Sequence, residues 1–144
     1  MTKTIRREIL IPQPRELVWR AIADSAALAE WMFPNDFVPR VGHRFTFQVP
    51  PNPKVNFDGL VVRCEVLECE PPSRLAFSWA AGGLADTQVS FQLEPDGEGT
   101  RLLFEHSGFD ASWPAQAVRG AEFGWTKMLG QLPAVVAGLA GGHN

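Results

Sequence analysis

His106 is the residue of this sequence best placed to do chemistry. It ends an alternating run, Leu102, Phe104 and His106, that is typical of the inward face of a β-strand. A neutral imidazole in an apolar interior can donate to a ligand oxygen, and it can also act as a general acid or base. The plainer alternative, and the commoner arrangement, is a core histidine that only bonds a backbone carbonyl.

Other catalytic chemistry finds no support in the residue types and their spacing. The three histidines and two cysteines lack the close spacing of a zinc site, so we expect no metal and no cofactor. No serine stands in a Gly-x-Ser-x-Gly turn, Cys64 has no base beside it, and tyrosine is absent. We therefore expect no catalytic residue, unless the protein is an enzyme that uses His106.

Composition narrows the class of protein. The chain has 144 residues, of which 45% are hydrophobic and 20% charged, as in one ordinary globular domain spanning 1–144. Its net charge of −3 and the lack of a Lys/Arg cluster argue against nucleic-acid binding. No apolar run approaches the roughly 20 residues of a membrane span, and the first residues do not form a secretory signal. Cys64 and Cys69 are expected to face opposite sides of one strand and stay unpaired, which indicates a cytoplasmic protein.

Alternation of apolar and polar residues predicts six strands. They cover residues 4–11, 44–49, 59–68, 74–79, 87–94 and 101–106. Short turns rich in proline and glycine join the last strands of the series. This pattern predicts an antiparallel meander with one apolar face.

Three helices are expected beside this sheet. Two short ones follow the first strand, the second capped by Asp24 or Ser25, and a long one runs from about Ser112, as its N-cap, to Leu139. Only the long helix is apolar enough over its length to cover the sheet. The sequence therefore predicts an α+β fold, in which a curved antiparallel sheet of about six strands grips one long C-terminal helix.

Several stretches carry a resemblance to a known superfamily. They are Pro14 to Asp24 (PRELVWRAIAD), Leu28 to Trp31, Gly59 to Glu68, Pro71 to Trp79 (PPSRLAFSW), Gly99 to Leu102, His106 to Phe109, and Gly124-Trp125 with Leu129 and Leu132. Together they resemble the SRPBCC (START-like, helix-grip) superfamily, in the branch related to the activator of heat-shock-protein ATPase. The resemblance covers nearly the whole chain and implies the helix-grip fold. It implies no single function, because the superfamily includes lipid and hormone binders, cyclases and co-chaperone domains.

A partly hollow interior is the main functional expectation. One helix does not fill the concave side of such a sheet, and Gly120, Ala121 and Gly124 on that helix leave further room. Aromatic rings on the inward face, the rim and the long helix would then line an apolar pocket of the usual small-ligand kind. The expected ligand-binding residues are Trp31, Phe33, Phe45, Phe47, Trp79, Phe91, Phe104, His106, Phe109, Trp113, Trp125 and Met128.

Three functions remain open from the sequence. The first is binding of a small hydrophobic or aromatic molecule without catalysis. The second is a cyclase or lyase type of enzyme that moves a proton through His106. The third is a co-chaperone-like module that binds a protein partner through exposed apolar residues such as Val61, Leu67 and Leu103. We rank them in this order, for a protein that is a monomer or a homodimer.

Overall fold

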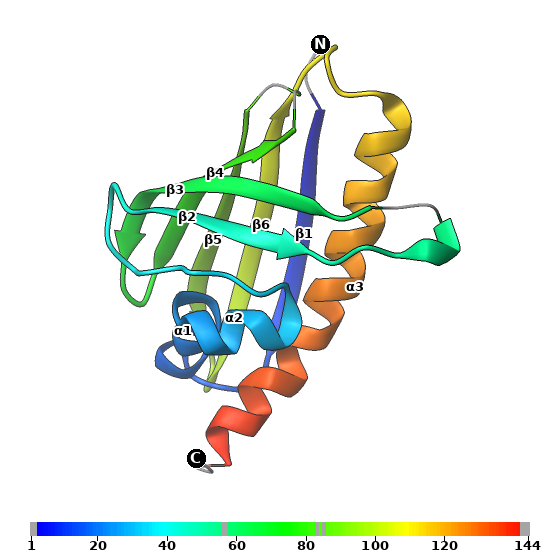
Figure 1. Cartoon of the computed structure of the whole chain (residues 1–144). Coiled ribbons are helices and arrows are strands. Elements are labelled where there is room, and N and C mark those ends of the chain that lie inside the picture. Colours follow the sequence, from blue (N-terminus) through cyan, green and yellow to red (C-terminus); the bar gives the residue numbers. More distant parts are fainter. Residues whose placement is uncertain (1–2, 56–57, 83, 85, 142–144) are drawn as a thin grey trace.

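Antiparallel strands form one curved sheet in the computed structural model, which describes residues 3–55, 58–82, 84 and 86–141. The strands are β1 (Lys3–Ile11), β2 (Arg44–Val49), β3 (Leu60–Glu70), β4 (Arg74–Ala81), β5 (Thr87–Asp96) and β6 (Gly99–Phe109). Their order across the sheet is β1-β6-β5-β4-β3-β2, so β1 pairs with the last strand and β2 to β6 form the predicted meander (Figure 1).

The helices lie against this sheet. They are α1 (Arg15–Ala23), α2 (Ser25–Trp31) and α3 (Ala115–Ala140), with a short 3-10 helix at Pro53–Val55. In Figure 1, α3 runs along the sheet, and its C-terminal part approaches α1 and α2 at the lower end of the molecule. The α+β helix-grip architecture predicted from the sequence is confirmed. Among the described residues, none of the helices combines the length and apolar character that crossing a membrane requires.

The helix starts follow local capping chemistry. Asp24 caps α2 by accepting a hydrogen bond from the backbone N–H of Ala27 at 3.0 Å. Ser112 was expected to cap α3, and that expectation is wrong, because the helix begins at Ala115. The Asp110 carboxylate accepts from both the backbone N–H and the hydroxyl of Ser112, at 2.8 and 2.6 Å, and so holds this residue in a turn before the helix.

The space between α3 and the sheet is filled at only one end. Toward α1 and α2, the side chains of Leu129, Leu132 and Val136 on α3 are buried in the core. The N-terminal half of α3 instead turns small residues such as Ala121 and Gly124 toward the sheet. Large side chains therefore close the C-terminal end of this space and leave the N-terminal end open.

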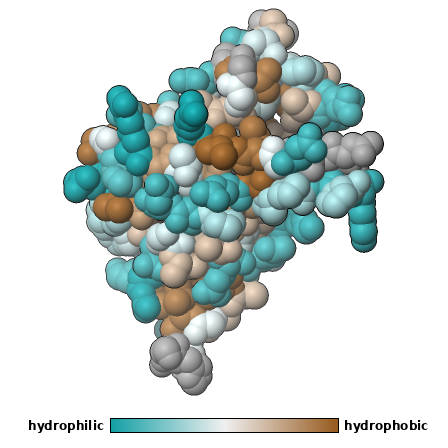
Figure 2. Space-filling model, viewed as in Figure 1, coloured by the Kyte–Doolittle hydropathy of each residue, from teal (hydrophilic) through white to brown (hydrophobic). Residues whose placement is uncertain are grey.

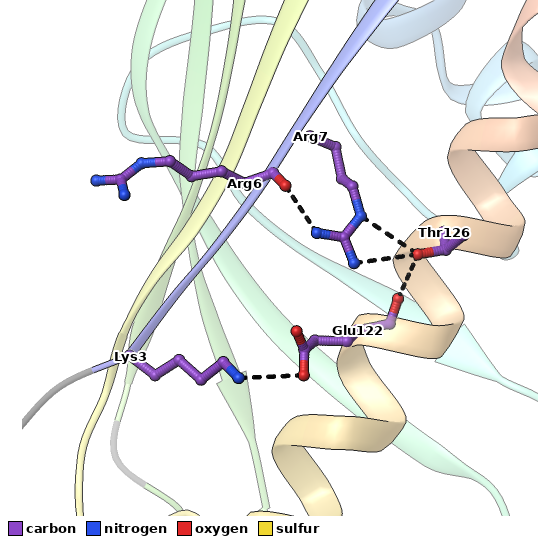
Figure 3. A network of polar contacts seen from close by, with 5 residues as sticks. All are labelled: Lys3, Arg6, Arg7, Glu122 and Thr126. Carbon is purple, nitrogen blue, oxygen red and sulfur yellow. Dashed lines mark hydrogen bonds and ion pairs between the residues drawn. The ribbon is translucent and has the colours of Figure 1, made fainter.

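Polar contacts join α3 to the edge strand β1 (Figure 3). Arg7 donates from Nε and Nη2 to the Thr126 hydroxyl, at 3.3 and 3.2 Å, and from Nη1 to the backbone carbonyl of Arg6. The same hydroxyl donates to the backbone carbonyl of Glu122. Nearby, Lys3 Nζ lies 3.3 Å from the Glu122 carboxylate. These contacts hold the two elements together on the β1 side of the molecule.

Candidate functional site

The open end of the interior is an apolar cavity of about 590 Å³. Strands β2 to β4, His106 of β6 and the segment after β4 form one side, and the N-terminal half of α3 forms the other. Its lining residues are Phe33, Val49, Leu60, Val62, Trp79, Ala81, Gly82, Leu84, His106, Trp113, Ala117, Gly120, Ala121, Gly124, Trp125 and Met128. None of them carries a formal charge at neutral pH, which makes the site suited to uncharged molecules.

Half of the aromatic and other side chains predicted to bind a ligand line this cavity. They are Phe33, Trp79, His106, Trp113, Trp125 and Met128. The others, Trp31, Phe45, Phe47, Phe91, Phe104 and Phe109, are buried in the packed core and are absent from the cavity wall. Ring contacts explain this placement: Phe45 lies 5.4 Å from Phe47 and from Phe77, measured between ring centroids.

Sequence reasoning missed the aliphatic and small part of the wall. Leu60 and Val62 share the inward face of β3, as the alternation in the sequence indicates. The site prediction did not include them because it considered mainly aromatic residues. Gly120 and Gly124 were recognised as leaving room without being named as lining residues. Their spacing of four on one helix was the usable signal.

His106 is a fully buried residue of the cavity wall, and both of its ring nitrogens are engaged. The indole N–H of Trp125 donates to Nδ1 at 2.9 Å. Because an indole N–H can only donate, Nδ1 carries no proton, and the proton of the neutral ring is on Nε2. Nε2 then donates to the Thr87 hydroxyl at 2.6 Å, and this hydroxyl donates to the backbone carbonyl of Trp79 at 3.0 Å.

This chain of hydrogen bonds fixes the tautomer of His106, and burial of the ring keeps it neutral. The ring is fully buried, and desolvation by burial lowers the pKa of His106 from 6.5 to about 3. The imidazole is therefore neutral at physiological pH and has no free nitrogen for a substrate. In this arrangement it connects α3 to the sheet and does not present an acid or a base to the cavity.

Other reactive groups do not gather into a site. In the part of the chain that the structure describes, no group of three or more His, Cys, Asp or Glu side chains is placed to hold a metal ion. Cys64 is buried, and burial raises the pKa of its thiol, so the nucleophilic thiolate is suppressed.

The outer face of the sheet carries scattered apolar side chains. Val61 and Leu67 on β3 are 51% and 40% exposed. Between them on the strand lie Arg63 and Glu65, and the Glu65 carboxylate lies 3.7 Å from the Arg44 guanidinium. Figure 2 shows hydrophobic surface on the viewed face as separate patches between hydrophilic side chains. A continuous apolar docking surface is therefore not formed on β3.

Solved structures with the same fold resemble this chain over nearly its whole length. MLL2253 from Mesorhizobium loti is 33% identical with a TM-score of 0.83, covering 94% of this chain and 97% of that one. CalU16 from Micromonospora echinospora is 27% identical with a TM-score of 0.71, covering 94% of this chain and 75% of that one. DynU16, a protein from the dynemicin biosynthetic locus, is 25% identical with a TM-score of 0.77, covering 93% of this chain and 47% of that one. The present chain thus spans about half the length of DynU16.

A search of curated proteins found no match. A family model, however, matches most of the chain. The model described as Activator of Hsp90 ATPase homolog 1-like protein matches residues 12–137, a range that contains all the lining residues of the cavity given above. The fold, the cavity between α3 and the sheet, and this match agree with one another. The chain belongs to the Activator of Hsp90 ATPase homolog 1-like family, within the SRPBCC superfamily.

Proposed function

We propose that the protein binds a small hydrophobic or aromatic molecule in the cavity between α3 and the sheet. The observation that carries this proposal is the cavity itself, with its volume of about 590 Å³ and its uncharged wall. Pockets that take small organic ligands are commonly between roughly 300 and 1,000 Å³ and mostly apolar. Trp79, Trp113 and Met128 would contact the ligand, together with the more deeply buried His106 and Trp125 of the same wall.

The two alternative functions have less support. An enzyme that moves a proton through His106 needs a free ring nitrogen, and both nitrogens are engaged by Thr87 and Trp125. A protein-binding module needs a continuous exposed patch, and charged side chains separate Val61 from Leu67. The similarity to a protein from a biosynthetic locus also favours a small-molecule ligand over a protein partner.

Filling the cavity from α3 tests the proposal. A side chain added at Gly124 would project into open space, because apart from the adjoining residues and backbone of α3 no described heavy atom lies within 4 Å of the Cβ position there. We expect the uncharged fluorescent probe N-phenyl-1-naphthylamine to bind the unmodified protein, with a rise in emission. Gly124→Leu should weaken this binding at least tenfold, because leucine takes up volume that the probe needs.

Gly130→Leu is the matched control. Gly130 is exposed on the same helix, also has open space around its Cβ position, and does not line the cavity. Both substitutions replace a helical glycine, so neither should lower the free energy of unfolding, and each could raise it by about 0.5–1 kcal/mol. The proposal fails if the probe does not bind the unmodified protein, or if Gly124→Leu and Gly130→Leu bind it equally well.

A further inference from the structure

The indole of Trp79 forms part of the cavity wall and is almost fully buried. It points inward from β4, and only 8% of the residue is exposed. Its ring centroid lies 5.7 Å from that of Phe47, 5.5 Å from that of His106 and 5.4 Å from that of Trp125. Rings therefore surround the indole on the sides that face the core.

The N–H group of this indole has no partner within the described ranges. The indole N–H of Trp31 donates to the backbone carbonyl of Ala21, and that of Trp125 donates to His106, but the Trp79 N–H makes no hydrogen bond to a described residue. Every fully buried side-chain nitrogen or oxygen in the described chain does have a partner. The Trp79 N–H must therefore reach accessible space, and the space beside this residue is the cavity.

The other polar groups near this wall are already engaged. Both nitrogens of His106 are in hydrogen bonds, and the Thr87 hydroxyl accepts from one of them while it donates to a backbone carbonyl. A guest in the cavity thus meets an unused donor at Trp79, whereas the side-chain donors of His106, Thr87 and Trp125 are already in hydrogen bonds. An unpaired donor in a desolvated site favours a guest that can accept from it over one that cannot.

We propose that the ligand is an uncharged ring compound with a hydrogen-bond acceptor, such as a ketone or ether oxygen or an aromatic nitrogen, that accepts from the Trp79 indole N–H. This inference rests on the proposed function of the cavity and adds the chemical class of its ligand. A carboxylate is disfavoured, because none of the described residues that line the cavity carries a positive charge to offset its desolvation. A pure hydrocarbon fits the cavity but leaves the donor unpaired.

A matched pair of small guests tests this inference. 1-Indanone and indane have the same ring skeleton and differ in the carbonyl group. We expect 1-indanone titrated into the ¹⁵N-labelled protein to move the Trp79 indole N–H resonance downfield, and indane to leave it nearly in place. The ratio of the Kd of indane to the Kd of 1-indanone should fall at least fivefold in Trp79→Phe, because this variant keeps a ring and lacks the donor.

Trp19→Phe is the control, since it removes an indole that does not line the cavity and should leave both Kd values unchanged. If Trp79→Phe does not fold, the indole resonance of the unmodified protein decides the question. Binding of both guests with no movement of that resonance, or with the same Kd ratio in Trp79→Phe, overturns the acceptor inference and leaves the proposed function standing. If neither guest binds, both the acceptor inference and the proposed function are wrong.

Discussion

His106 shows how a single side chain changes role once its partners are known. The sequence places it on an inward strand face, where it could serve a ligand or the core. Its partners Thr87 and Trp125 each lie 19 positions away along the chain, so only the folded arrangement brings the three together. No sequence pattern predicts this pairing, although a threonine with inward parity at the start of a strand was a visible hint.

The buried neutral state of His106 predicts a specific pH dependence of stability. The unfolded side chain binds a proton near pH 6.5, and the folded one near pH 3. Its stabilising contribution is therefore complete above pH 6.5 and is lost as the pH falls toward 3. Between pH 7 and pH 5 the unfolding free energy should decrease by about 2 kcal/mol through this group alone.

Urea unfolding at the two pH values measures this loss, with His106→Gln as the comparison because glutamine does not titrate. The variant should lose about 2 kcal/mol less than the unmodified protein over the same interval. An imidazole resonance of His106 that titrates between pH 7 and pH 5 in the folded protein would contradict the buried neutral state, whether or not the variant folds.

At the scale of elements, α3 divides into two halves with different tasks. Leucines and valines in the C-terminal half complete the core, and small residues in the N-terminal half leave the cavity open. The helix and its apolar face were predictable from periodicity. The end of the sheet that stays hollow was not predictable. The alternation of residues shows on which face of a strand a side chain lies, but it does not show where that side chain lies along α3.

The attachment of α3 to β1 is testable by substitution at Thr126. Thr126→Val removes the oxygen that accepts from Arg7, and we expect a loss of about 1 kcal/mol in unfolding free energy. Lys3→Ala should cost less than about 0.5 kcal/mol, because its ion pair with Glu122 is exposed and screened by solvent. Urea denaturation of both variants checks the order, and a larger loss for Lys3→Ala would contradict it.

At the scale of the whole molecule, the fold was predictable and the detailed cavity was predictable in part. Alternating strands, one long helix and the family resemblance together specified the helix-grip architecture. The cavity followed from the shortage of side-chain volume on one helix facing a curved sheet. The rings that line it could not be separated from those that pack the core, because both sets share the same inward face.

The central claim is that an apolar guest binds inside the cavity and not on the surface. Two neighbouring valines can report which of these two sites the guest occupies. Val62 lines the cavity, and Val61 points outward and is 51% exposed. The most direct measurement is an isotope-filtered NOE spectrum of ¹³C-labelled protein with unlabelled naphthalene. Cross-peaks from naphthalene to the methyl groups of Val62 and Met128, with none to Val61, are the predicted result. Cross-peaks to Val61 or Leu67 alone would contradict the account.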